Sequence, residues 1–279
     1  METLFFKVAD ILFTIQGKSA DELKKLLPSY APFNIAATDA KPALSLTVED
    51  GAIDTSAVGE ELGQFDCGGS NHGIYRTEQG YKIIISTVEG NVASAMLTNA
   101  DFSVCKVSLF GNDADRLFGI GNAMMIAFAF AAAYYDTILM HASVTMNEGR
   151  GYLFLGKSGT GKSTHSKLWM KHIAGSDLLN DDNPAVRFTP QGAIVYGTPW
   201  SGKTPCYRNL QVPIGGLICS TFTTSRSFSR NGRMLKPLTL KVALCPLSIE
   251  RLISVIKMWL GTCNIRFSIF FRVMNGVMR

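Results

Sequence analysis

The sequence lacks the close pairs of cysteine and histidine that bind structural zinc. Its 279 residues include six cysteines and four histidines, but no C-x-x-C pair and no close cluster of the two residue types. Zinc sites need such clusters, and disulfide-stabilised secreted domains are denser in cysteine, so we expect neither. The N-terminus also lacks a basic segment followed by an apolar run, so no signal peptide is expected. These absences predict a cytoplasmic protein.

Long apolar runs without charge are nearly absent as well. The exception is residues 117–135, a stretch of 19 uncharged residues that is long enough to cross a bilayer. Two glycines and Asn122 interrupt this run, and charged residues bracket it closely on both sides. A helix buried against a sheet explains it better, so we expect no membrane span. With 47% hydrophobic and 18% charged residues, the chain has the composition of a globular protein.

The pattern of apolar residues divides the chain into three parts. Residues 1–110 contain β-branched and aromatic runs separated by Gly, Asn, Asp and Glu, which predicts a β-rich N-terminal module of antiparallel strands. In residues 111–219 strands alternate with helices, which predicts an α/β layer. Residues 220–279 form a basic C-terminal segment. The predicted fold class is therefore α/β, a kinase-like domain around a phosphate-binding loop (P-loop) preceded by the β-rich module.

The clearest functional signal is a glycine-rich segment that follows a short apolar strand. Residues 156–163 read GKSGTGKS and match the phosphate-binding loop G-x-x-x-x-G-K-[ST] in full. Its glycines let backbone N–H groups converge on an anion, and the helix expected after it adds the positive end of its dipole. In such loops the lysine contacts the β- and γ-phosphates and the serine hydroxyl ligates Mg²⁺. The residues expected to bind ATP are Gly156, Lys157, Ser158, Gly159, Thr160, Gly161, Lys162, Ser163 and Thr164.

Two adjacent carboxylates, Asp181 and Asp182, follow the next apolar strand. One helix and one strand fit between Lys162 and this pair, so the pair should lie at a strand end beside the loop. Neighbouring side chains on an extended backbone point in opposite directions. One carboxylate can therefore bind the metal with Ser163, and the other can accept the proton of a substrate hydroxyl. The sequence does not separate the two roles, and Asp182 is taken as the metal ligand; a solvated Asn-Asp-Asp-Asn-Pro turn is the alternative.

A third polar segment, residues 196–208, follows another predicted strand. It carries Lys203 and Arg208, whose positive charges would neutralise a phosphoryl group during its transfer. Two prolines and two glycines in the segment are also typical of a plain surface loop.

Three of these stretches together resemble the kinase domain of the HPr kinase/phosphorylase family. They are His141-Ala-Ser-Val, residues 151–163 and the LLNDD of residues 178–182, and the resemblance covers about residues 115–218. The family is grouped with the ATP-type phosphoenolpyruvate carboxykinases, so the resemblance implies their type of kinase fold. It also implies that Lys162 and Ser163 hold phosphate and Mg²⁺, that one aspartate of the pair accepts the hydroxyl proton, and that His141 lies near the reacting phosphate.

The chain also departs from that family. The further loop with which HPr kinases contact HPr is not found after Arg208, and residues 1–110 do not match the usual N-terminal domain of those enzymes. HPr itself is therefore not the expected acceptor.

The resemblance ends before the basic C-terminal segment. Residues 1–219 carry a net charge of −4, whereas residues 220–279 carry +9 and only one acid, Glu250. Such a segment is typical of a nucleic-acid surface, or of an amphipathic segment that binds a membrane surface or a partner. A shifted reading frame or an altered gene end would also produce it, and the abrupt change in composition favours this third interpretation.

The sequence therefore predicts a kinase. We expect Mg²⁺-dependent transfer of the γ-phosphoryl group of ATP to a hydroxyl of a protein serine or a small metabolite. A nucleotide-binding regulator with little turnover, or an enzyme related to phosphoenolpyruvate carboxykinase, is the alternative. The expected partners are the nucleotide and the hydroxyl acceptor, without nucleic acid.

Overall fold

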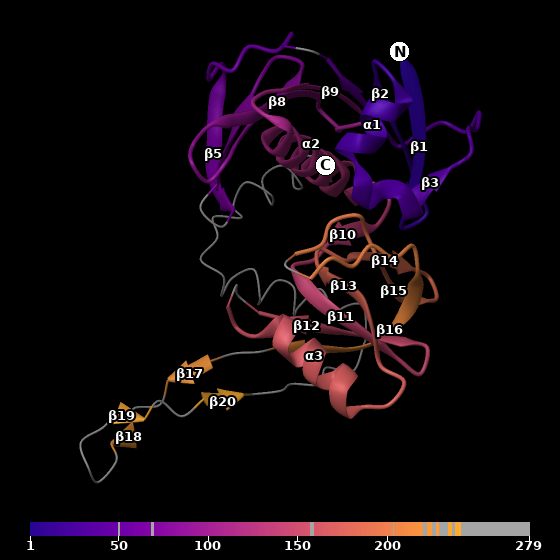
Figure 1. Cartoon of the computed structure of the whole chain (residues 1–279), viewed down its shortest axis with the longest axis vertical. Coiled ribbons are helices and arrows are strands. Elements are labelled where there is room, and N and C mark those ends of the chain that lie inside the picture. The colour runs from indigo at the N-terminus through magenta and orange to yellow at the C-terminus, as the bar shows by residue number, and fades with distance from the viewer. Residues whose placement is uncertain are drawn as a thin grey trace. The chain divides into compact units, whose positions relative to one another are not determined.

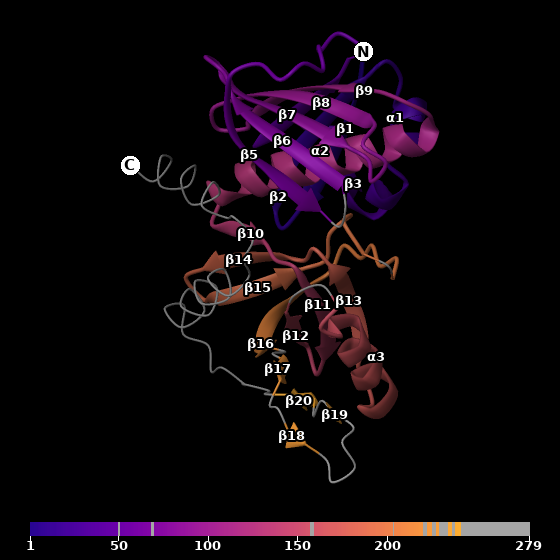
Figure 2. The same ribbon diagram turned by 90° about the vertical axis from the view of Figure 1, so that its left-hand side faces the viewer.

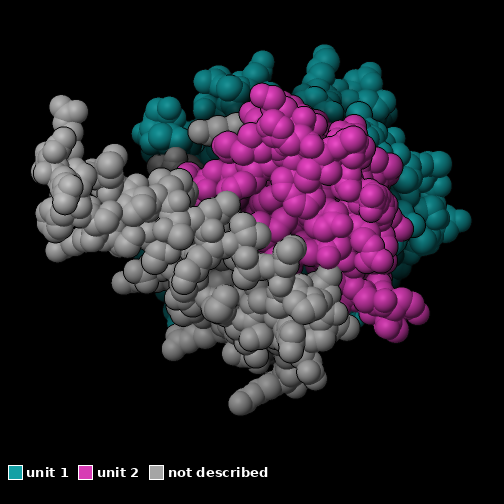
Figure 3. All heavy atoms as spheres, turned by 90° about the horizontal axis from the view of Figure 1, so that it is seen from below, with its two compact units in different colours: residues 1–138, 265–279 teal, residues 139–264 magenta. Residues whose placement is uncertain are grey.

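A computed structural model describes residues 1–49, 51–67, 70–156, 159–202 and 204–219, together with short strands between residues 222 and 240 (Figure 1). Those short strands are β17 (Phe222–Thr224), β18 (Ser227–Phe228), β19 (Met234–Leu235) and β20 (Leu238–Leu240). The rest of the basic C-terminal segment lies outside the described residues, so the interpretations of it stay open. The described residues up to 138 belong to one compact unit, and those from 139 belong to a second (Figure 3).

The first unit is built on a nine-stranded sheet. Its strand order is β3-β1-β2-β4-β9-β8-β7-β6-β5, and β5 to β9 pair antiparallel with their neighbours in the chain. The two parallel pairs are β2 with β4 and β4 with β9. The strands are β1 (Glu2–Val8), β2 (Ile11–Gly17), β3 (Asn34–Ile35), β4 (Leu44–Val48), β5 (Glu60–Cys67), β6 (Ser70–Arg76), β7 (Gly80–Ser86), β8 (Val92–Asn99) and β9 (Val104–Leu109).

A long apolar helix, α2 (Asp113–Ala133), fills the curve of this sheet (Figure 2). Its N-cap Asn112 accepts hydrogen bonds from the backbone N–H groups of residues 114 and 115, and the Asp115 carboxylate accepts one from the Asn112 N–H. The buried side of the helix is made mostly of small residues, which allows close packing on the strands. Phe128 packs edge-on against Phe13 of β2, with ring centroids 5.8 Å apart. Burial of this face accounts for the apolar run.

Two shorter helices complete the first unit. They are α1 (Ala20–Leu26), which begins at the N-cap Ser19, and the 3₁₀-helix η1 (Pro28–Phe33). Among the described helices, α2 is the one that is long and apolar enough to cross a membrane. Because α2 packs on the sheet of its own unit, the described residues contain no clear membrane span.

The second unit is built on a seven-stranded sheet with the order β10-β14-β15-β16-β12-β11-β13. The helix α3 (Lys162–His172) packs on β11, β12 and β13. Trp169 of α3 contacts Tyr152 and Phe154 of β12, with ring centroids 4.9 and 5.4 Å apart. The strands are β10 (Thr137–Leu139), β11 (Ala142–Asn147), β12 (Arg150–Leu155), β13 (Asp177–Asp182), β14 (Ala185–Thr189), β15 (Gly192–Tyr196) and β16 (Gln211–Cys219).

The predicted α/β kinase fold is wrong. The described part of the chain is mostly β-sheet, with 44% strand and 22% helix, and of its two large sheets one is a half-barrel, so the fold is β-rich. In the described part of the second unit, α3 is the one helix that packs on the sheet. There β12 pairs parallel with β16, whereas the pairs β11–β12, β11–β13, β14–β15 and β15–β16 are antiparallel.

Two local features explain why the alternation of strands and helices was misleading. Glu148 and Gly149, with φ of +48° and +71°, form a two-residue turn that joins β11 and β12 into an antiparallel hairpin. The apolar helix α2, which the sequence pattern assigned to the α/β layer, packs on the N-terminal sheet instead.

Candidate functional site

The strand pairing of the second unit brings three separate segments of the chain to one sheet edge. Strands β12 and β13 both pair antiparallel with β11, which lies between them. Ala142, the first residue of β11, therefore lies opposite both Leu155, the last residue of β12, and Asp182, the last residue of β13. As a result His141, the glycine-rich loop and the aspartate pair meet at the same edge.

The glycine-rich loop leads directly into α3. Gly159 and Gly161 have φ of +81° and +87°, a backbone conformation that residues other than glycine rarely adopt. Gly161 is the N-cap of α3, so no side chain caps the helix, and its first turn contains no acidic residue. An uncapped N-terminus of this kind offers N–H groups and a partial positive charge to an anion.

The remaining residues of the predicted ATP-binding segment lie on either side of these glycines. Gly156 follows β12 directly, Thr160 is half-buried in the loop, and Thr164 is exposed on the first turn of α3. Lys157 and Ser158 lie outside the part of the chain that the structure describes.

Lys162 bends back toward the start of β11. Its ammonium group lies 2.6 Å from His141 Nε2 and donates to the carbonyl of Gly156 at 3.1 Å, and the residue is only 8% exposed. Because an ammonium group can only donate, Nε2 acts as the acceptor and the ring proton resides on Nδ1. That nitrogen lies 3.5 Å from Asp182 Oδ1.

The surroundings of His141 favour its neutral form. Removal of the ring from water lowers the pKa of His141 below its usual value, and the positive charge of Lys162 lowers it further. The carboxylates of Asp182 and Asp181 act in the opposite direction but do not reverse the shift.

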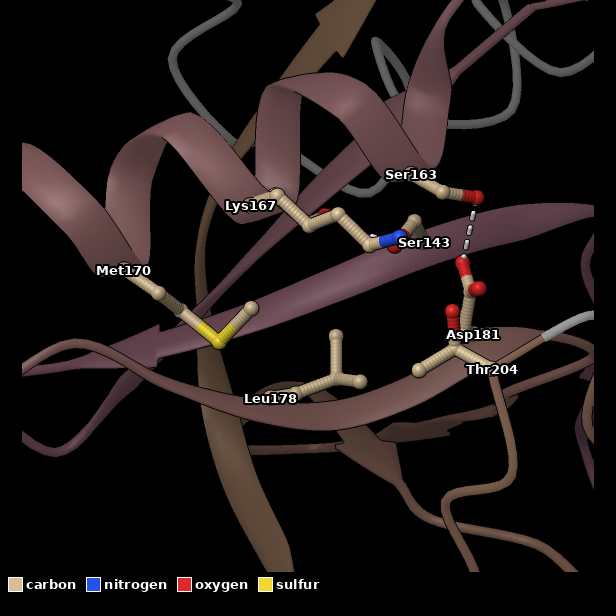
Figure 4. A pocket seen from close by; sticks show the side chains of 8 residues that line it. Ser143, Ser163, Lys167, Met170, Leu178, Asp181 and Thr204 are labelled. Carbon is tan, nitrogen blue, oxygen red and sulfur yellow. Dashed lines mark hydrogen bonds between the residues drawn. The ribbon is translucent and has the colours of Figure 1, made fainter.

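The two aspartates have different partners. The Ser163 hydroxyl donates to Asp181 Oδ1 at 2.8 Å, and Asp181 is 4% exposed (Figure 4). Asp182 has a φ of +124°, accepts a hydrogen bond from Asn183 and lies next to His141. One carboxylate is thus held at the N-terminus of α3, and the other faces the histidine.

A buried amide and hydroxyl hold the aspartate pair in place. The side chain of Asn180 donates to Thr198 and to the carbonyl of Trp200, and its oxygen accepts from the N–H of Asn183. The Thr198 hydroxyl in turn donates to the carbonyl of Asn183 at 2.7 Å. Both Asn180 and Thr198 are fully buried. Neither residue could be predicted from the sequence, because polar residues in a turn-like segment give no sign of burial.

The segment after β15 packs against the aspartate pair. The Ser201 hydroxyl donates to the Asp181 carbonyl at 3.0 Å, and Ser201 also forms a β-bridge with Asp182. Lys203, which was expected to act on the phosphoryl group, is not among the described residues.

Arg208 lies at the other end of β13. Its guanidinium pairs with Asp177 and donates to the Leu178 carbonyl at 2.7 Å. At about 3.3 Å per residue along a strand, the two ends of β13 are roughly 16 Å apart. The structure therefore does not bring Arg208 to the aspartate pair.

The oxygen atoms at the N-terminus of α3 are compatible with Mg²⁺. The described residues contain no group of three or more His, Cys, Asp or Glu side chains that could hold a metal. Mg²⁺ needs fewer protein ligands, since it usually keeps several waters and binds one or two carboxylates together with substrate phosphates. The hydroxyl of Ser163 and the carboxylate of Asp181 form such a set, whereas sequence analysis paired Ser163 with Asp182.

A small pocket borders this oxygen pair (Figure 4). Hydroxyl and charged side chains line one part of it, and Met170 and Leu178 close the other. The lining residues are Ser143, Ser163, Ser166, Lys167, Met170, Leu178, Asp181 and Thr204.

Comparison with known proteins does not identify a family. No family model matches the sequence, and no curated protein matches it.

Proposed function

We propose that the second unit is an ATP-dependent, Mg²⁺-requiring phosphotransferase that moves the γ-phosphoryl group to a hydroxyl. The observation that carries this proposal is the contact between Ser163 and Asp181 at the uncapped N-terminus of α3, beside Lys162, His141 and Asp182. Phosphoryl transfer depends mainly on positioning and charge neutralisation, and this edge collects groups for both. The resemblance to HPr kinase/phosphorylase supports transfer to a hydroxyl and remains a prediction.

The phosphates would bind at the start of α3. The N–H groups of the first helical turn point away from the helix, where an anion replaces the missing N-cap side chain. Lys162 is the first residue of the helix, and its flexible side chain can exchange the Gly156 carbonyl and His141 for phosphate oxygens.

Ser163 and Asp181 would hold the metal. Bound there, Mg²⁺ would neutralise part of the charge on the phosphates. The burial of Asp181 and its hydrogen bond from Ser163 fix both oxygen atoms before the nucleotide arrives.

Asp182 would accept the proton of the acceptor hydroxyl. Its side chain is about one-third exposed, so a substrate can reach it, and the Nδ1–H of His141 faces the same carboxylate. As the hydroxyl oxygen bonds to the γ-phosphorus, its proton passes to Asp182 and the bond from the γ-phosphorus to the bridging oxygen of ADP breaks. The neutral His141 stabilises the carboxylate of Asp182. Because its ring carries no full positive charge, it does not compete with the substrate hydroxyl as a proton donor to this carboxylate.

A nucleotide-binding regulator with little turnover is the second candidate. The position of Arg208 favours it, because the cation expected to neutralise the transferring phosphoryl group pairs with Asp177 instead. The two candidates share the phosphate site and differ only in whether the γ-phosphoryl group leaves the nucleotide.

The first test is transfer from ATP labelled at the γ-phosphate to a panel of metabolites and serine peptides. If Asp182 is the base, Asp182→Asn should lower the rate about 10²- to 10⁴-fold and keep nucleotide binding, since general-base catalysis contributes that much. Asp181→Asn should also lower the rate, and it should raise the Mg²⁺ concentration that the protein requires.

Asp177→Asn is the matched control at the other end of the same strand. It breaks an exposed ion pair with Arg208 and should leave transfer unchanged. If the wild-type protein binds the nucleotide but transfers its phosphoryl group neither to any hydroxyl nor to water, the kinase is excluded and the regulator is favoured.

A further inference from the structure

A second pair of hydroxyl groups joins α3 to the sheet, beside the proposed metal ligands. The oxygens of Ser143 and Ser166 lie 2.7 Å apart, and each residue is only 1% exposed. Neither residue belongs to the phosphate-loop motif or to the aspartate pair.

The strand register places this pair next to the contact between Ser163 and Asp181. Ser143 of β11 lies directly opposite Asp181 of β13. Ser166 follows Ser163 by three residues on α3, so the two serines occupy the same face of the helix. The first two turns of α3 are therefore attached to neighbouring strands by two hydrogen bonds between side chains. Figure 4 shows the one from Ser163 to Asp181.

Packing alone does not require hydroxyl groups at these positions. A buried hydroxyl loses its hydrogen bonds to water, and the bond to a second buried hydroxyl roughly compensates for that loss. A pair of alanines would avoid both effects. What the hydroxyl pair adds is direction, because a hydrogen bond constrains both the distance and the angle between its donor and its acceptor.

We propose that Ser143 and Ser166 are positioning residues that hold the Ser163 hydroxyl against Asp181 and thereby set the affinity for Mg²⁺ in the nucleotide complex. This inference rests on the proposed function, since it assigns the metal to Ser163 and Asp181. Residues that orient metal ligands from behind contribute strongly to metal affinity in other sites, where their loss lowers it 10- to 100-fold.

The test measures binding of a non-hydrolysable ATP analogue, β,γ-imido-ATP, by calorimetry over a series of Mg²⁺ concentrations. Mg²⁺ should raise the affinity for the analogue. In Ser166→Ala and in Ser143→Ala, the Mg²⁺ concentration that gives half of this increase in affinity should rise about tenfold. Affinity for the analogue without Mg²⁺ should stay as in the wild type, because the backbone of the loop is untouched. The double variant should be no worse than either single variant, since both remove the same hydrogen bond.

Two further variants separate positioning from packing. Thr145→Val changes a buried hydroxyl on the same strand that has no hydrogen-bond partner, so it should leave the Mg²⁺ dependence unchanged. Ser143→Thr keeps a hydroxyl at a position that borders the small pocket, so it should retain most of the wild-type behaviour.

The outcomes distinguish this inference from the proposed function. An unchanged Mg²⁺ dependence in Ser166→Ala, or an equal shift in Thr145→Val, would overturn the positioning role. Mg²⁺-dependent binding by the wild type without transfer to any acceptor would overturn the kinase but leave the positioning role supported if Ser166→Ala shifts as expected. A wild-type protein that binds no analogue would overturn both.

Discussion

The helices α2 and α3 begin in opposite ways. The N-terminus of α2 is capped by Asn112 and Asp115, and Asp113 adds a second acid to its first turn. The N-terminus of α3 follows Gly161, with no side-chain cap and no acid in the first turn. In α2 side chains cap the first N–H groups and acids face the positive end of the helix dipole, whereas no described side chain caps α3 and its first turn carries no acid. The missing cap, together with the glycine-rich motif beside it, marks the start of α3 as a candidate anion site.

Some of the buried serines of the two units also differ in their hydrogen-bond partners. In the first unit Ser94 donates to the carbonyl of Gly119 in α2, and Ser108 accepts from the N–H of Ile53. These contacts satisfy backbone groups within the core. In the second unit Ser163 contacts Asp181, and Ser143 contacts Ser166, so side chains bond to one another at the edge where the proposed site lies.

Among changes to the caps of the two helices, the largest effect is expected when α3 receives the kind of acid that α2 has. In Thr164→Glu a carboxylate occupies the third position of α3, which corresponds to Asp115 in α2. A unit charge about 6 Å from a phosphate changes the binding free energy by about 1–3 kcal/mol, depending on the local dielectric. Calorimetry with β,γ-imido-ATP and Mg²⁺ should therefore show affinity reduced about 5- to 150-fold.

Thr164→Gln is the matched control, because it has the same shape without the charge and should bind the analogue like the wild type. Equal binding by Thr164→Glu and the wild type would show that no phosphate lies at this helix terminus.

A smaller effect is expected when α2 loses its cap. Asn112→Ala removes the side chain that accepts from two N–H groups of α2. Loss of such a cap lowers the free energy of unfolding by about 1 kcal/mol. Urea unfolding should detect this change, while affinity for the analogue stays the same. A loss of analogue binding without a loss of stability would contradict the structural role of this terminus.

The smallest effect concerns pH. Because the folded protein lowers the pKa of His141 below its unfolded value near 6.5, the unfolded chain binds more protons around that pH. The stabilising contribution is present above pH 6.5 and is lost as the pH falls through 6.5 toward the folded pKa. The free energy of unfolding, measured in urea without Mg²⁺, should therefore decrease over this range.

His141→Gln should remove this part of the pH dependence. The opposite result would be a free energy of unfolding that rises in the wild type as the pH falls below 6.5 and does not rise in His141→Gln. It would mean that His141 is charged in the folded protein.

The sequence identified the local parts of the site but not their pairing. The GKSGTGKS motif predicted both the glycine-rich loop and the helix after it, because glycine positions and helix starts depend on neighbouring residues. The partner of Ser163 could not be predicted, since a shift of one residue in the pairing of β11 with β13 would exchange Asp181 for Asp182. The ion pair of Arg208 with Asp177 depends on the same long-range pairing.

The fold class was mispredicted for a related reason. Periodicity identifies strands and helices, but it does not show which strands are neighbours or in which direction they run. The turn at Glu148 and Gly149 makes β11 and β12 a hairpin, and this antiparallel pairing without a helix between the strands distinguishes the sheet from the α/β layer that was predicted.

The account depends most on the claim that the uncapped N-terminus of α3 binds the phosphates of a nucleotide with Mg²⁺. The most direct test is a calorimetric titration of the wild-type protein with β,γ-imido-ATP and Mg²⁺, with Lys162→Ala as the reference. The account predicts one nucleotide per chain, bound more tightly with Mg²⁺ than without it and lost or greatly weakened in Lys162→Ala. No binding by the wild type, or equal binding by Lys162→Ala, would contradict it.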